Sequence, residues 1–169
     1  PVIHSDVHVL AINPLNNQLY AGDDGGICYT ANGGTNWKDI SNGLGITEIY
    51  KLGQSSSRSD MMLIGCQDNG SAQYENKKWY SVLGGDGMVC AIDPKDTNYQ
   101  YVEIYYGDIY RSTDAGKTFY TTIAGQNVGG VTEQGAWVTP YMISYANRNE
   151  MFAGYNNLWK CSNVKAYTP

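Results

Sequence analysis

Long apolar runs and clustered basic residues are both missing from this 169-residue sequence. No window approaches 18 consecutive apolar residues, so we expect no membrane-spanning helix. The formal net charge is −5 and the isoelectric point is near 4.8. This balance argues against nucleic acid as a partner, because phosphate binding needs grouped Lys and Arg side chains. Glycans, cations and proteins stay open as partners.

Helical periodicity and closely paired cysteines are missing as well. No window places apolar residues at i, i+3, i+4 and i+7 over three turns, so the sequence predicts no helix. The cysteines are Cys28, Cys66, Cys90 and Cys161. They stand singly in apolar segments without C-x-x-C spacing, so a cysteine zinc site is not expected. Two interpretations stay open: buried free thiols, which we favour, or a disulfide such as Cys66 with Cys90.

Glycine and tyrosine are abundant instead, with 20 Gly and 15 Tyr beside only 5 Pro. The most informative stretch, residues 110–119, reads Y-R-S-T-D-A-G-K-T-F, and Ser112 and Thr118 flank its centre. It predicts a tight hairpin in which Asp114 accepts hydrogen bonds from turn amides and Gly116 supplies unusual backbone angles. Phe119 then returns apolar surface to the core.

Degraded copies of this pattern recur along the chain. The first copy consists of Thr30, Asn32, Gly34 and Trp37. Gly34 lies 82 residues before Gly116, and between them Trp79 closes a hairpin at residues 74–78. The period is therefore about 40 residues, as in four-stranded propeller blades. A fourth copy begins at residues 158–163, and we expect the aromatic residues of these hairpins to pack between blades.

The spacing resembles the Asp-box, the hairpin signature of the sialidase-like and sortilin-like β-propellers. This resemblance implies an all-β chain with about four four-stranded blades, at residues 5–41, 42–83, 84–124 and 133–169. It also implies a larger ring of six to eight blades, with the remaining blades elsewhere in the parent chain. The last blade lacks a final strand unless residues 1–4 provide it.

Further turns resemble those of large secreted or surface-displayed propellers of gliding and polymer-degrading bacteria. They read D-x-H at 6–8, D-G-G at 24–26, Q-D-N-G at 67–70, G-D-G at 85–87 and G-A-W-V-T-P at 135–140. Studied relatives of that group include xyloglucanase-type glycoside hydrolases, sialidases, sortilin-type receptors and a photosystem assembly factor. The resemblance implies a location outside the cell or on the bacterial cell surface.

One rim of the expected blades gathers the polar residues. Successive turns of a blade alternate between two faces, so the box hairpins share one face and the other turns share the opposite rim. The candidate ligand-binding residues on that rim are His8, Asp24, Glu48, Gln67, Asp68, Asn69 and Trp137. Asp6 and Asp86 lie there too.

Three chemistries fit this rim. Asp86 and Asp6 could cleave a glycosidic bond, one as acid and one as base or nucleophile. Several oxygens could instead hold Ca²⁺, although the spacing of an EF-hand is absent. Alternatively, the rim binds a glycan or a protein by hydrogen bonds while Trp137 stacks on a sugar ring.

A purely structural interpretation competes with each of these. An Asp before Gly, as at Asp24 and Asp86, is typically a turn former. Likewise His8 on an apolar strand is typical of a hydrogen-bonded core histidine, and Trp137 fits a core position as well as a ligand platform.

We therefore expect a binding or interaction scaffold with a glycan or protein ligand and no cofactor other than Ca²⁺ at the rim. The alternative is a glycoside hydrolase, a xyloglucanase-like endo-glucanase. A sialidase would need three arginines for its substrate carboxylate. Only Arg58, Arg111 and Arg148 exist, and Arg111 lies in a box hairpin, so that activity is not expected.

Overall fold

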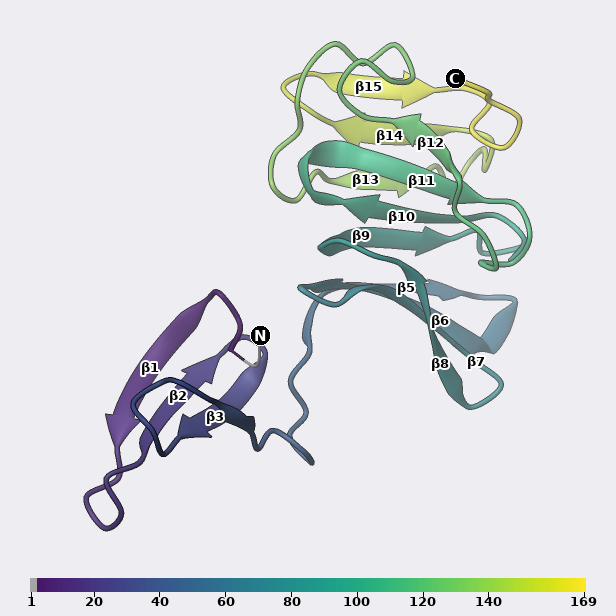
Figure 1. Ribbon diagram of the computed structural model, residues 1–169. Helices are drawn as coiled ribbons and strands as arrows, with labels where there is room; N and C mark the ends of the chain where they lie inside the picture. The colour runs from purple at the N-terminus through teal and green to yellow at the C-terminus, as the bar shows by residue number, and fades with distance from the viewer. Residues whose placement is uncertain (1–2) are drawn as a thin grey trace. The chain divides into compact units, whose positions relative to one another are not determined.

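The computed structural model describes residues 3–169, which form β-strands and turns without an α-helix (Figure 1). The strands make four antiparallel sheets, three with four strands and one with three. The chain divides into two compact units, one ending at Thr47 and the other spanning Glu48–Pro169. Within the described range, no helix has the length and apolar character to cross a bilayer.

The first unit holds one four-stranded sheet. Its strands are β1 (Val7–Ile12), β2 (Leu19–Asp23), β3 (Gly26–Thr30) and β4 (Lys38–Asp39), paired in chain order. The β1–β2 turn contains Pro14, which cannot donate to a ladder, and Asn17, which has a positive φ of 54°. Side chains of β1 are exposed along its whole length.

The second unit holds three sheets, each again paired in chain order. The first sheet has β5 (Glu48–Ser55), β6 (Arg58–Gln67), β7 (Gly70–Glu75) and β8 (Lys78–Leu83). The second has β9 (Gly87–Ile92), β10 (Gln100–Ile104), β11 (Asp108–Ser112) and β12 (Thr121–Ala124), with a single 3₁₀ turn at Tyr105–Gly107. The third has β13 (Tyr141–Ile143), β14 (Met151–Gly154) and β15 (Leu158–Cys161).

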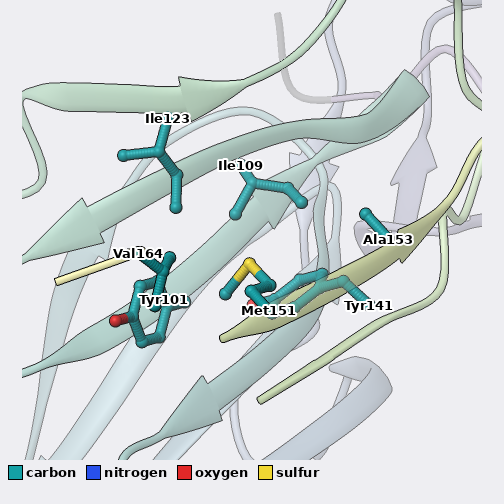
Figure 2. Close-up of a cluster of buried hydrophobic side chains, with 7 residues drawn as sticks. All are labelled: Tyr101, Ile109, Ile123, Tyr141, Met151, Ala153 and Val164. Carbon is teal, nitrogen blue, oxygen red and sulfur yellow. The ribbon is translucent and has the colours of Figure 1, made fainter. Parts of the chain in front are cut away.

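Two apolar layers join these three sheets face to face. The β5–β8 and β9–β12 sheets enclose Met61, Leu63, Cys90, Ile92, Val102 and Phe119. The β9–β12 and β13–β15 sheets enclose Tyr101, Ile109, Ile123, Tyr141, Met151 and Ala153, joined by Val164 from the C-terminal segment (Figure 2). Tyr101 and Val102 are neighbours in β10 yet serve different layers, because side chains alternate across a strand.

Close approach of β6 to β9 depends on a glycine. A Cβ built on Gly65 would lie 2.0 Å from the carbonyl oxygen of Met88. The backbones of β6 and β9 are therefore in direct contact at this point. Any residue larger than glycine would force the two sheets apart.

The bounds of some strands are not marked by local composition. The Ser-rich segment 55–60 forms only a two-residue turn, because β5 extends to Ser55 and β6 begins at Arg58. Arg58 stabilises this extension by donating from Nη1 to Glu75 at 2.6 Å and from Nη2 to Asp60 at 2.8 Å. β13 begins only at Tyr141, directly after Pro140, which cannot donate to a ladder.

The ring-closing strand considered at residues 1–4 stays a prediction. Residues 1–2 lie outside the described range, and Ile3 and His4 belong to no strand. Over residues 3–169, β15 pairs with β14 alone.

Predictions for the cysteines and one tryptophan have mixed outcomes. All four cysteines are free thiols, so the Cys66–Cys90 disulfide is not formed. Cys90 instead donates to the carbonyl of Leu63 at 3.0 Å, and burial raises the pKa of its thiol to about 12.

Trp79 is 51% exposed, which contradicts its expected packing between blades. Its ring lies against Tyr74 across the β7–β8 hairpin, with ring centroids 5.2 Å apart.

Candidate functional site

The hairpin at residues 112–119 is built around one carboxylate. The Ser112 hydroxyl donates to Asp114 at 2.7 Å and itself accepts from the backbone N–H of Gly116 at 2.9 Å. Thr118 donates to Asp114 from its backbone N–H at 3.0 Å and from its hydroxyl at 2.7 Å. Burial raises the pKa of Asp114, but the donors from Ser112 and Thr118 outweigh it and hold the pKa below its ordinary value. Phe119 enters the core, so this is a structural unit.

The earlier copy keeps the same network with an amide in place of the carboxylate. The Thr30 hydroxyl donates to Asn32 Oδ1 at 3.0 Å and accepts from the N–H of Gly34 at 3.0 Å. The N–H of Asn36 donates to the same Oδ1 at 2.9 Å. Trp37 lies over Gly34: a Cβ built on this glycine would be 3.8 Å from Nε1 of the indole ring. An Asn therefore does in the first unit what Asp114 does in the second.

In the first unit, Asp6, His8 and Asp24 lie together at one end of the sheet. The N–H of Asp24 donates to the carbonyl of Asp6 at 3.3 Å, and His8 Nε2 pairs with Asp24 Oδ1. The His8 side chain is 68% exposed, so the interpretation as a core histidine is wrong.

In the second unit, the predicted polar residues lie at the start of β5, in the β6–β7 turn and just before β9. Glu48 pairs with Gln67 across the β5–β6 ladder. Asn69 donates its side-chain amide to the carbonyl of Gln67 at 3.1 Å. Asp86 Oδ1 accepts from the backbone N–H of Asp68 at 2.7 Å. Asp86 thus ties the turn to the start of β9, the turn-forming task that its sequence context also allowed.

The two proposed catalytic carboxylates belong to different units. Asp6 lies in the first and Asp86 in the second. Their cooperation in a single reaction stays a prediction.

Trp137 forms an aromatic platform with two tyrosines that the sequence did not single out. Its ring stacks on Tyr105 with centroids 5.4 Å apart and planes 6° from parallel, and it meets Tyr106 edge to face at 5.5 Å. Trp137 is 37% exposed and Tyr106 is 41% exposed. The platform (Tyr105, Tyr106, Trp137) therefore combines fixed geometry with surface open to a ligand.

Strained backbone and close contacts hold the platform in place. Tyr106 has a φ of 66°, unusual for a bulky side chain. Two backbone hydrogen bonds clip the Tyr106 turn to the Trp137 segment, from Tyr106 N to the Trp137 carbonyl at 3.4 Å and from Gly135 N to the Tyr106 carbonyl at 3.0 Å. The Tyr155 hydroxyl donates to the carbonyl of Gly107 at 2.5 Å. Positive-φ residues of this kind persist only where the surroundings over-determine them.

A buried carboxyl group lies beneath the same segment. Glu103 on β10 is fully buried; its Oε1 accepts from the N–H of Thr139 at 2.8 Å and its Oε2 from the N–H of Val89 at 3.1 Å. Burial raises the pKa of Glu103 to about 8, although these backbone donors oppose the rise. Because it has no exposed surface, Glu103 serves as a support for the loop that contains Trp137 and cannot itself touch a ligand.

A polar cluster joins the segment before Gly135 to the β14–β15 hairpin. Glu133 accepts from the indole N–H of Trp159 and from the backbone N–H of Asn157, the latter at 3.1 Å. The Trp159 donor, followed by Asn157, holds the pKa of Glu133 below its ordinary value. This carboxylate thus fastens the chain to the hairpin two residues before Gly135, whose N–H bonds to the Tyr106 carbonyl.

A separate cavity of about 350 Å³ lies between β12 and the β14–β15 hairpin. Ile123, Met151 and Ala153 on its walls also belong to the core layer between those sheets. Its mostly apolar walls extend the core, and we assign it to packing.

Comparison with known proteins gives the class of fold. No protein-family model and no curated protein matches the chain. Among solved structures, it resembles an ancestral GH74 enzyme at 15% identity and a TM-score of 0.54, covering 97% of this chain and 24% of the other. It also resembles the GH74 enzyme of Niastella koreensis at 14% identity and a TM-score of 0.56, covering 96% and 30%.

A third similar structure is the GH74 xyloglucanase from Xanthomonas campestris, at 11% identity and a TM-score of 0.55, covering 96% of this chain and 29% of that one. At such identities the likeness shows the fold alone, which is the predicted all-β propeller architecture. The chain spans between 24% and 30% of the length of these three structures.

Proposed function

We propose that this chain is a binding scaffold whose ligand contacts the aromatic platform of the second unit. The observation that supports this proposal is the stacked Tyr105–Trp137 pair, which is partly exposed and is held by a buried carboxyl group. Stacking and backbone clips fix the rings before a ligand arrives, so little side-chain entropy is lost on binding.

A glycan is the ligand that this surface fits best. Exposed aromatic rings offer an apolar face for the C–H groups of a sugar, and Tyr and Trp combine that face with a polar edge. Asn157 Nδ2 donates to Glu133 Oε2 at 3.3 Å, and we assign this amide and carboxylate to the hydroxyl groups of the glycan. The net charge of −5 favours a neutral or cationic ligand over an acidic one.

Calorimetric titration with neutral oligosaccharides, including β-glucan fragments, tests this proposal. Trp137→Ala should weaken binding at least about tenfold, in line with truncation of a central aromatic contact. Tyr120→Ala is the matched control, because Tyr120 is 89% exposed and has no place in the platform. A protein as ligand is indicated if no saccharide binds while a partner protein binds wild type and loses affinity for the Trp137 variant. If Trp137→Ala and Tyr120→Ala bind every ligand with equal affinity, the proposed role of the platform is refuted.

A glycoside hydrolase is the second candidate, because the matched solved structures include GH74 enzymes, one of them a xyloglucanase. Asp86 and Asp6 are the residues that we assign to this alternative. Release of reducing sugar from a polysaccharide panel by the intact parent protein, lost in Asp86→Asn and Asp6→Asn, would support it. Retained release in both variants would remove these residues from the reaction.

We propose in addition that the scaffold acts outside the cell or at the cell surface, and that further blades of the parent chain complete a larger ring. The turn sequences at residues 6–8, 24–26, 67–70, 85–87 and 135–140 motivate the location. The share of 24% to 30% that this chain covers of the similar structures motivates the larger ring. Fractionation of the source cells tests the location, because recovery of the protein only from the cytoplasm would contradict it.

A further inference from the structure

Three donor groups converge at the end of the sheet in the first unit, independently of the aromatic platform. One ligand atom each from His4, Asp6 and Asp24 lies within 4.8 Å of the others. His4 Nδ1 and Asp6 Oδ2 are 3.4 Å apart. In a tetrahedral site with metal–ligand bonds of about 2.1 Å, two ligand atoms are also about 3.4 Å apart. This pair therefore already has the spacing that a shared metal ion requires.

Backbone hydrogen bonds fix the two segments that bring these donors together. The N–H of His4 donates to Asp23 Oδ2 at 3.1 Å, and the N–H of Gly25 donates to Asp23 Oδ1 at 2.9 Å. A third bond joins the N–H of Asp24 to the carbonyl of Asp6. Gly25 lets the histidine approach, since a Cβ at this position would lie 3.2 Å from the Cβ of His4. The convergence thus follows from the fold of the turn.

Hydrogen bonds around the donors orient both carboxylates. His8 Nε2 pairs with Asp24 Oδ1, which leaves the other oxygen of Asp24 for a further ligand. The Ser5 hydroxyl donates to Asp6 Oδ2 at 3.1 Å. Metal-binding carboxylates are commonly held by such outer hydrogen bonds, whose loss lowers metal affinity.

From this geometry we propose that His4, Asp6 and Asp24 bind a divalent transition-metal ion, with Zn²⁺ as the reference ion. One imidazole and two carboxylates form a donor set suited to Zn²⁺, Co²⁺, Ni²⁺ or Mn²⁺. Ca²⁺ takes oxygen ligands, so the imidazole disfavours it. Two carboxylates balance the charge of the ion, and the exposed position of Asp6 leaves the remaining coordination positions to water.

Calorimetric titration of the full chain with ZnCl₂, under reducing conditions at pH 7.5, tests the site. We expect one equivalent to bind, and Co²⁺ to give the visible absorption of a nitrogen- and oxygen-ligated ion. His4→Ala and Asp6→Asn should each lower the affinity at least tenfold. His8→Ala should lower it by about tenfold through Asp24, the effect of losing an outer hydrogen-bond partner.

Two control variants separate this site from other sources of metal binding. Asp39→Asn removes a carboxylate of the same unit whose partner is the backbone N–H of Ser41, and Cys161→Ala removes the one cysteine that is not buried. Both should bind Zn²⁺ as wild type does. Unchanged affinity in His4→Ala, loss of binding in Cys161→Ala, or saturable binding of Ca²⁺ but not Zn²⁺ would each overturn the proposal. Circular dichroism of each variant shows that the comparison is between folded proteins.

Discussion

Replacing Asp114 measures how much one box hairpin contributes to the second unit. Its carboxylate accepts three hydrogen bonds, one from Ser112 and two from Thr118. A hydrogen bond to a charged group contributes about 1.5–3 kcal/mol, but water can replace part of this at a half-buried site. We therefore expect Asp114→Ala to lower the free energy of unfolding by about 2–4 kcal/mol.

The matched variant is Asp114→Asn. Asn32 makes the equivalent bonds in the first unit through a single amide oxygen, so an amide at position 114 should keep most of the network and cost about 1 kcal/mol. Urea denaturation followed by circular dichroism gives both values, with the slope of the transition unchanged if only stability is altered. The reasoning is refuted if the Ala variant unfolds at the wild-type urea concentration, or if Asn costs as much as Ala.

Three further substitutions, with one control, test the packing and the buried carboxyl groups of the second unit. Gly65→Ala should cost about 3 kcal/mol or more because its Cβ would overlap β9, whereas Gly84→Ala, with open space around it, should be nearly neutral in the same thermal melt. Asp93→Asn should cost about 2–4 kcal/mol at pH 7, because it breaks the buried ion pair with Lys165 at 2.6 Å. Burial raises the pKa of Asp93, but Lys165 and the backbone N–H donors of Lys95 and Asp96 together outweigh it and hold the pKa below its ordinary value of 3.8. A wild-type stability curve no steeper in acid than that of the Asn variant would contradict this. The pKa of Glu103 is about 8 in the folded protein, against an ordinary value of 4.5. The folded protein therefore binds the proton more tightly, and stability should fall as pH rises from 4.5 to 8, by up to about 5 kcal/mol. Glu103→Gln should flatten that slope, and an equally steep slope would disprove the raised pKa.

Local patterns could be read directly from the sequence, and the hydrogen bonds show why. Asp114 and Asn32 lie two residues after a hydroxyl and two before a glycine, so the network of each hairpin forms within eight residues of chain. Such interactions need no knowledge of distant segments.

Distant contacts decided the rest. Tyr106 reaches Trp137 from a turn about 30 residues away, and only the glycine at 107 after two tyrosines hinted that this turn was unusual. Glu103 follows two buried residues in a strand where a charged side chain would ordinarily face water, and the backbone donors that hold it come from other segments. Trp79 is exposed because its hairpin partner is Tyr74 rather than a neighbouring sheet. None of these partners follows from local spacing.

The measurement that tests the binding proposal most directly is the proton–nitrogen NMR spectrum of the four indole N–H groups during addition of the ligand identified by calorimetry. The account predicts that the resonance of Trp137, assigned from Trp137→Ala, shifts progressively until the ligand saturates. The resonance of Trp37 in the first unit should stay in place. A Trp137 resonance unchanged at saturation, or shifts confined to other tryptophans, would contradict it.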